Sequence, residues 1–317
     1  MRYTRCLHER GNDEVGLGVD DGRGSRARAG ELMRHPTPPP FAWDENAASD
    51  TRRIVRGPVQ QASVLVIAGL DPSGGAGLIA DAQVVWQHGF HVAGTVTALT
   101  EQDSVMCSWM HPTDPSMVSN QIARLIDDFE IRGVKIGMLA NPEMAAAVAR
   151  SIKRLAEHRV PIVIDPVLRA TRGIPLLEGN AMKALTPLLS MATLVTPNLE
   201  ELATLTADHV ATDAETMRGQ ARRLKQFGPR AVLAKGGHLE GDIVDVLVDE
   251  EGDTAIRGQR VDGPTPHGTG CALSSEIACR LAFGTPLREA VVGACNRVRL
   301  RIAEARVVGR GRPFLGL

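Results

Sequence analysis

Two glycine-rich segments of the sequence have the composition of loops that hold an anionic ligand on backbone amides. Residues 69–77 read Gly-Leu-Asp-Pro-Ser-Gly-Gly-Ala-Gly and follow a short apolar run. Glycine lets a backbone approach its ligand closely, and the amides at the start of a helix favour anions. The segment lacks the Gly-Lys-Ser/Thr ending of a Walker A loop, and it is no dinucleotide-binding GxGxxG. Taken alone, it is equally well explained as a tight strand-to-helix turn.

The second segment is His267-Gly268-Thr269-Gly270-Cys271, which stands at the start of a predicted amphipathic helix. The apolar residues that follow recur every four positions, at Leu273, Ile277 and Leu281. Free amides in the first helical turn suit a developing phosphoryl charge and are expected to lower the pKa of a thiol placed there. Cys271 is therefore a candidate reactive group, whereas Cys279 and Cys295 are interpreted as buried structural cysteines.

A candidate site for magnesium and phosphate follows two other predicted strands. Asn198 and Glu201 are three residues apart on one helix face, so both could serve one hydrated magnesium ion. A helix N-cap with first-turn acids explains the same pair equally well. Lys235 ends a strand directly before two glycines, which would place an ammonium group over phosphates. A surface lysine is the less favoured alternative.

Two further polar residues follow predicted strands. Asp165 closes the apolar run 162–164 and offers another carboxylate at the same sheet edge. Gln102 follows the run 97–100, and its carboxamide, which both donates and accepts hydrogen bonds, could read the edge of an aminopyrimidine. By itself, Gln102 is an ordinary loop residue.

The elements that must position these residues alternate between strand and helix. The hydrophobic pattern predicts strands at residues 64–68, 94–99, 134–139, 162–165, 194–195 and 231–234. It predicts helices at about residues 142–157, 179–189, 199–206 and 214–227, and a hairpin arm at 243–248 after the turn 240–242. Such alternation implies an α/β fold, with a mostly parallel central sheet and helices on both faces. Ligands of such sheets bind beyond the carboxyl ends of the strands.

Composition narrows the classes of function. The chain has 317 residues, is 43% hydrophobic and carries a net charge of −1, which gives no overall attraction to nucleic acid or to an anionic membrane. The charged N-terminus and the five cysteines, without a CxxC pair, favour a cytoplasmic protein. Residues 1–60 have ten arginines, no lysine and no apolar periodicity. They are predicted to be a flexible extension of a single domain at 61–317.

Seven segments occur together in one order, and this order carries a family resemblance. They are AGLDPSGGAGLIAD (68–81), TALTEQDS (97–104), VKIGMLA (134–140), IDPV (164–167), TPNLEE (196–201), AKGGHLEGD (234–242) and HGTGCALSSEIA (267–278). The chain thus resembles the hydroxymethylpyrimidine/phosphomethylpyrimidine kinases, the thiamine-pathway members of the ribokinase-like family. The resemblance covers about residues 62–306. Cys271 stands where the sugar kinases of the family generally carry an aspartate.

The resemblance implies a ribokinase-like sheet of nine or so strands with a small flap, and ATP and Mg²⁺ as cofactors. It also implies two successive phosphorylations of 4-amino-5-hydroxymethyl-2-methylpyrimidine, first on the hydroxymethyl oxygen and then on the phosphate. Family members are commonly homodimers. No nucleic acid or membrane is expected as a partner.

The resemblance further implies a role for each candidate residue. The pyrimidine would be surrounded by Gly69, Asp81, Gln102 and Met138. Cys271 would be the base beside the acceptor hydroxyl, and the amides of Gly268, Thr269, Gly270 and Cys271 would form the anion hole. Lys235, with Asp165 and Thr269, would bind the nucleotide. Asn198 and Glu201 would hold magnesium through water.

Several positions depart from the family pattern. Arg169 and Arg172 replace mostly small or uncharged residues, Asp103 stands where asparagine is usual, and Val105–Met110 is an unusual flap sequence. Two alternatives to the pyrimidine kinase therefore stay open. One is a kinase of pyridoxine-type vitamers, whose substrates are also hydroxymethylated nitrogen heterocycles. The other is a pyrimidine-binding protein without catalytic activity.

Overall fold

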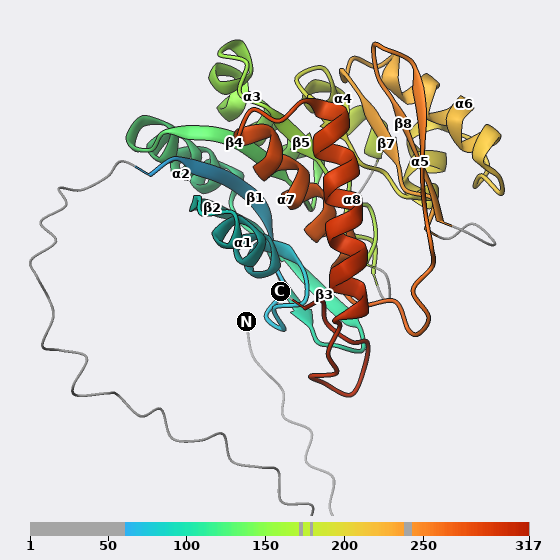
Figure 1. Cartoon of the computed structure of the whole chain (residues 1–317). Coiled ribbons are helices and arrows are strands. Elements are labelled where there is room, and N and C mark those ends of the chain that lie inside the picture. The colour runs from blue at the N-terminus through green and yellow to red at the C-terminus, as the bar shows by residue number, and fades with distance from the viewer. Residues whose placement is uncertain (1–60, 171–173, 178–179, 238–242, 317) are drawn as a thin grey trace, which may run out of the picture. The chain divides into compact units, whose positions relative to one another are not determined.

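The fold is described from a computed structural model, which describes residues 61–170, 174–177, 180–237 and 243–316. The predicted flexible extension at 1–60, the predicted turn at 240–242 and Arg172 lie outside the described residues. Figure 1 shows the arrangement of the elements.

The described strands form one nine-stranded sheet in the order β3-β2-β1-β4-β5-β6-β7-β8-β9. Neighbouring strands from β2 to β7 pair in parallel, whereas β3, β8 and β9 pair antiparallel at the two edges. This sheet confirms the predicted fold class. The strands are β1 (Ser63–Leu70), β2 (His91–Gln102), β3 (Cys107–Pro112), β4 (Ile131–Ile136), β5 (Ile162–Ile164), β6 (Leu194–Val195), β7 (Val232–Ala234), β8 (Ile243–Val248) and β9 (Asp253–Gly258).

Helices cover both faces of the sheet, as predicted (Figure 1). One group shares a core with one face of the strands and comprises α2 (Pro115–Asp128), α3 (Pro142–Glu157), α4 (Ala181–Leu189), α5 (Leu199–Thr206) and α6 (Ala214–Lys225). The other group packs on the opposite face and comprises α1 (Gly77–Gln87), α7 (Thr269–Ala282) and α8 (Leu287–Ala303).

Strand β1 explains why its sequence is continuously apolar. Leu65 and Ile67 point into the core beneath α2 and α3, whereas Val64 and Val66 point into the core beneath α1 and α7. All four side chains are fully buried. Successive strand residues face opposite sides, so a strand covered on both sides must be apolar throughout.

The predicted elements agree with the observed ones, but some elements were not predicted. The strands β3 and β9 and the helices α2 and α8 are present although no strand or helix was predicted there. Strand β3 pairs with the end of β2 and forms the expected small flap, with its turn at residues 103–106. Strand β8 is the predicted hairpin arm, antiparallel to β7.

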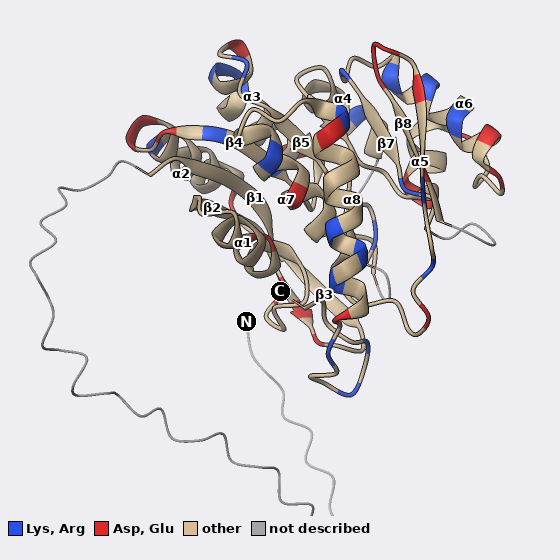
Figure 2. Cartoon of the chain, viewed as in Figure 1, with Lys and Arg blue, Asp and Glu red and all other residues tan. Residues whose placement is uncertain are grey.

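Charged residues lie mainly on helices and loops, while β1 carries none (Figure 2). Both signs are interspersed, which agrees with the nearly neutral net charge. Among the described helices, none combines the length and the apolar character that crossing a bilayer requires.

Candidate active site

A cavity of about 370 Å³ lies at the carboxyl edge of the parallel strands. Strands β1, β4, β5, β6 and β7 each end at it, and they or the residues just after them contribute Gly69, Met138, Asp165, Asn198 and Lys235. This is the location predicted from the strand pattern. The lining also includes the predicted residues Gln102, Glu201, Gly268, Thr269, Gly270 and Cys271.

Asp81 is the predicted site residue that does not line the cavity. Helix α1 turns its side chain into the protein, where it is fully buried against Lys135 and Ser275. The Lys135 ammonium donates to Asp81 at 2.5 Å, and the Ser275 hydroxyl donates to the other carboxylate oxygen at 2.8 Å. The predicted direct contact of Asp81 with the pyrimidine is therefore wrong for this structure.

Lys135, the partner of Asp81, lines the cavity instead of Asp81. It was not predicted as a site residue. Burial is the largest effect and would lower its pKa, but the negative charges of Asp81 and Asp165 and the hydrogen bond to Asp81 are among the effects that together raise it, so the side chain stays charged. The sequence contained a signal for this pair. A lysine between the apolar neighbours Val134 and Ile136 in a buried strand requires an acidic partner.

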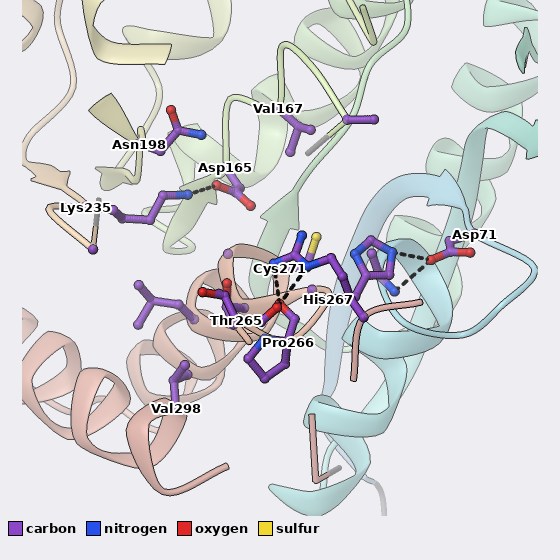
Figure 3. A pocket seen from close by; sticks show the side chains of 18 of the residues that line it. Asp71, Asp165, Val167, Asn198, Lys235, Thr265, Pro266, His267, Cys271 and Val298 are labelled. Atoms are coloured by element: carbon purple, nitrogen blue, oxygen red, sulfur yellow. Dashed lines mark hydrogen bonds and ion pairs between the residues drawn. The ribbon is translucent and has the colours of Figure 1, made fainter. Parts of the chain in front are cut away.

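A second ion pair lies at the ends of β5 and β7. The Lys235 ammonium donates to Asp165 at 2.7 Å and lies 3.9 Å from a carboxylate oxygen of Glu201. Burial disfavours the charged form of Lys235, but Asp165 and Glu201 together raise its pKa. In Figure 3, the Lys235 side chain points at Asp165 on one side of Cys271. The site thus holds a charged ammonium group where the prediction placed one.

Asn198 and Glu201 form a capping box at the start of α5. The Asn198 side chain accepts from the Glu201 amide at 2.9 Å, and a Glu201 carboxylate oxygen accepts from the Asn198 amide at 2.8 Å. Burial is the largest effect on Glu201 and raises its pKa to about 7. Of the two interpretations of this pair, the helix N-cap is thus the one that the hydrogen bonds support.

Asn198 and Glu201 were also predicted to hold a magnesium ion. Within the described part of the chain, no three His, Cys, Asp or Glu side chains are grouped closely enough to hold a metal ion directly. Magnesium usually keeps several waters and is bound by one or two carboxylates together with substrate phosphates. Asp165 and Glu201, which both line the cavity, fit such a hydrated ion. Asn198 also lines the cavity, and its side-chain oxygen caps the helix; its role in holding magnesium through water stays a prediction.

The two glycine-rich segments meet at the start of α7. Gly268 caps this helix with a φ of 81°, and a side chain there would collide with the carbonyl oxygen of Gly75. Both the backbone angle and the contact therefore require glycine. Among the described residues, no side chain caps the helix, so the first amides of α7 remain available to an anion at the cavity.

Cys271 lies in the first turn of α7 with a half-buried side chain that lines the cavity. Burial raises the pKa of its thiol to about 11, although Lys135 and the Gly77 amide oppose this rise. The predicted lowering of the pKa is thus wrong, because removal of water from the thiol outweighs the helix-start amides. At neutral pH the side chain is a thiol.

Gln102 takes part in a polar cluster with Asp71 and His267. Figure 3 shows the His267 ring beside Asp71. The ring nitrogen Nε2 of His267 lies 2.9 Å from an oxygen of Asp71 and 2.7 Å from the Gln102 amide nitrogen, which itself lies 3.2 Å from Asp71. Burial would raise the pKa of Asp71, but hydrogen bonds from His267 and Ser73 lower it. Asp71 and His267 were not predicted as site residues, although each belongs to one of the two glycine-rich segments identified in the sequence.

The opposite wall of this end of the cavity is apolar. Cys107, Met138 and Leu176 belong to one buried cluster, with Val167 packed against it, and all four line the cavity. The Met138 sulfur lies so close to Gly69 that a side chain at Gly69 would overlap it. A flat, partly polar ring fits between this apolar wall and the Gln102 carboxamide.

Comparison with known proteins agrees with this geometry. A model of the phosphomethylpyrimidine kinase family matches residues 71–314. A hydroxymethylpyrimidine/phosphomethylpyrimidine kinase of Streptomyces coelicolor is 40% identical over 258 residues, which are 80% of this chain and 93% of the relative. The thiamine biosynthesis bifunctional protein ThiED of Geobacter sulfurreducens is 38% identical over 296 residues, and the match covers 92% of this chain but 59% of that longer relative.

Solved structures share the fold. The ADP complex of Bacillus subtilis pyridoxal kinase matches with a TM-score of 0.73 and 27% identity, over 81% of this chain and 97% of that one. The phosphomethylpyrimidine kinase of Clostridium difficile matches with a TM-score of 0.64 and 31% identity, over 77% and 99%. Because the family model spans most of the chain and the Streptomyces coelicolor kinase is matched over 93% of its length, the chain belongs to the phosphomethylpyrimidine kinase family.

Proposed function

We propose that the protein transfers the γ-phosphoryl group of ATP to 4-amino-5-hydroxymethyl-2-methylpyrimidine and then to the resulting monophosphate. The observation that carries this proposal is one cavity with two kinds of wall. Its apolar end beside Gln102 suits a small aminopyrimidine, and the Lys235 ammonium and the α7 amides suit phosphates. The kinase relatives of Streptomyces coelicolor and Clostridium difficile support this assignment.

In this proposal the residues around Lys235 position and stabilise the transferred group. The acceptor hydroxyl oxygen forms a bond to the γ-phosphorus while the bond from that phosphorus to the ADP oxygen breaks. The amides of Gly268, Thr269 and Gly270 and the Lys235 ammonium stabilise the charge on the phosphoryl oxygens. Asp165 and Glu201 would hold magnesium through water, and this ion supplies further neutralisation of the phosphates. Phosphoryl transfer is loose, so the hydroxyl proton leaves late, to water or to an oxygen of the transferred phosphoryl group, and a strong base contributes little.

The nucleotide base would occupy the other end of the cavity. Val261, Val298 and Ile302 provide apolar lining there, beyond Lys235 and Gly237. The related pyridoxal kinase of Bacillus subtilis was crystallised with ADP, which supports a nucleotide site in this fold. A homodimer in the cytoplasm completes the proposal, and light scattering during gel filtration tests the dimer.

A coupled ATP assay with products resolved by mass tests the proposed function. The pyrimidine alcohol, its monophosphate and pyridoxine are supplied separately with magnesium. We expect the monophosphate from the first substrate, the diphosphate from the second, and turnover of pyridoxine at a lower kcat/KM. Preferred turnover of pyridoxine would favour the vitamer kinase, and failure with all three substrates would favour a binding protein.

Gln102→Ala tests the pyrimidine end of the site. The change removes a side chain that we expect to form two hydrogen bonds with the ring, which corresponds to roughly 1–3 kcal/mol of binding free energy. The KM for the pyrimidine should rise while the KM for ATP stays nearly unchanged, as initial rates at varied concentrations of each substrate would show. An equal rise for both substrates would contradict the assignment of Gln102.

A further inference from the structure

The C-terminal segment, residues 306–316, folds back to the mouth of the cavity. The backbone groups of Arg306 and Phe314 bond to each other in both directions at 2.8 Å, so the segment forms a closed loop. Its end is fastened by Leu315, which is buried in the core under α7 and α8. The segment is thus a fixed part of the domain.

One side of this loop contacts the turn of the flap. The amide of Arg312 donates to the carbonyl oxygen of Ser104 at 2.9 Å, and the amide of Gly311 donates to the Ser104 hydroxyl at 3.0 Å. A side chain at Gly309 would overlap the Ser104 hydroxyl. A side chain at Gly311 would overlap the Ser104 carbonyl group. The contact therefore needs glycine at both positions.

The other side of the loop contacts the segment that leads into α7. The Arg312 guanidinium, which lines the cavity, donates to the carbonyl oxygens of Thr265 and Pro266 at 2.8 and 2.9 Å. The His267 amide donates to the carbonyl oxygen of Pro313 at 2.8 Å, and the Phe314 ring lies 6.0 Å from the His267 ring. These contacts fix His267, whose ring contacts Gln102 and Asp71.

We propose that this segment completes the substrate site and that Arg312 is a positioning residue for pyrimidine recognition. Arg312 joins the flap turn at Ser104 to the loop before the anion hole, through its backbone and its side chain. The position of Gln102, which ends the flap strand β2 and contacts His267, is thereby set from both sides. Only the expected change in the KM for the pyrimidine rests on the proposed function; the contact between the segment and the flap does not.

Gly311→Ala tests the contact between the segment and the flap, with Gly219→Ala in α6 as the matched control. A side chain at Gly219 meets no neighbour within 4 Å, so this variant should behave as the parent. We expect Gly311→Ala to speed hydrogen exchange at residues 103–106 by roughly tenfold or more, because the flap turn loses its partner. The KM for the pyrimidine should rise roughly tenfold, with little change in the KM for ATP.

Three further variants test the segment, and one of them, Arg312→Lys, separates a positioning role of Arg312 from an effect of its charge alone. Gly309→Ala should have the same effect as Gly311→Ala, and Ser104→Gly added to it should restore most of the KM, because the overlapping hydroxyl is then absent. Arg312→Lys keeps the charge but loses the fork that binds two carbonyl groups, so it should raise the KM for the pyrimidine as Gly311→Ala does. Parent-like kinetics of Arg312→Lys would show that only the charge matters, and would overturn the positioning role.

The exchange measurement separates this inference from the proposed function. Unchanged exchange of the flap in Gly311→Ala would overturn the inference even if the pyrimidine is a good substrate. If the parent protein phosphorylates no pyrimidine but the flap exchanges faster in the variant, the proposed function fails and the coupling of segment and flap stands.

Discussion

Two opposing effects act on the thiol of Cys271. The Lys135 ammonium and the Gly77 amide favour the thiolate, whereas burial favours the neutral thiol. With a pKa of about 11, burial is the larger effect. The fraction of thiolate at neutral pH is then roughly one part in ten thousand, since each pH unit below the pKa lowers it tenfold. In the proposed reaction, Cys271 would therefore shape the cavity more than it would accept a proton.

Cys271→Ala should consequently lower kcat by less than about tenfold, since phosphoryl transfer depends mainly on positioning and charge stabilisation. The backbone amides of the anion hole are retained in this variant. Steady-state kinetics with the pyrimidine alcohol measure the effect, and Cys279→Ala is a control for loss of a buried thiol outside the cavity lining. A fall in kcat of roughly 10²–10⁴ with unchanged KM would instead identify Cys271 as a general base.

The free energy of unfolding should depend on pH through Glu201. Burial raises its pKa from the ordinary 4.5 to about 7 in the folded state. Between these values the unfolded chain releases the proton and the folded protein keeps it, so this group's contribution to stability is lost as pH rises toward 7. Glu201→Gln removes the effect. The variant should therefore gain stability relative to the parent from pH 5 to pH 8 in magnesium-free urea denaturation.

Glu200→Gln is the control for that experiment, because Glu200 is the exposed neighbour in the same helical turn. Its stability relative to the parent should stay constant over this pH range. If Glu201→Gln and the parent had parallel pH profiles, Glu201 would titrate at its ordinary pKa in the folded protein.

At the scale of elements, the pair of Asp81 and Lys135 connects α1 to β4, and Ser275 adds α7. Lys135→Met leaves the Asp81 charge buried without its partner, which should cost roughly 3–5 kcal/mol of unfolding free energy. The double variant Asp81→Asn/Lys135→Met should lose less, since no charge is left unpaired. Urea denaturation of the three proteins measures these differences.

Lys153→Met provides a comparison from an exposed ion pair. Lys153 and Glu157 lie 3.8 Å apart on α3, and both side chains are more than half exposed. Loss of such a pair should cost less than about 1 kcal/mol. Equal losses for the variants at Lys135 and Lys153 would show that the buried pair is not a link between the elements.

The sequence predicted those elements that bury a continuous apolar surface. β3 and β9 were not predicted because edge strands bury few side chains, such as Ile256 in β9. Helix α2 fully buries only Val118 and Ile122, and α8 packs mainly through small residues between arginines. The hydrophobic pattern of α8 is therefore weak, and tertiary packing determines this helix. Helix α2 is as strongly amphipathic as the predicted helices α4 and α6, so its sequence did contain a signal for a helix.

The same distinction applies to the site. Residues such as Asp165 and Lys235 could be placed together, because the carboxyl ends of parallel strands meet at one sheet edge. The inward direction of Asp81 and the contact of His267 with Gln102 could not be predicted. They depend on side-chain packing between segments that lie far apart in the sequence.

At the scale of the whole molecule, residues 61–316 contain every strand of the described sheet and every described residue that lines the cavity. β1 is paired on both sides, by β2 and β4, and its first residue Ser63 already donates to the carbonyl oxygen of Glu130. Both faces of β1 are covered by helices of the same part of the chain. Within the described residues, β1 is thus paired on both edges and covered on both faces by the domain itself.

Deletion of residues 2–60 should therefore leave folding and turnover intact. We expect a melting temperature within about 3 °C of the parent, because a larger shift in a domain of this size would require the loss of roughly 1 kcal/mol or more. A variant that starts at Met33 is the intermediate control and should also match the parent. A deletion that continues to Val66 removes buried residues of the central strand β1 and should abolish soluble expression. Thermal denaturation and the coupled ATP assay measure the outcome. A large fall in melting temperature for the deletion of 2–60 would show that this segment packs on the kinase domain, and would contradict its prediction as a flexible extension.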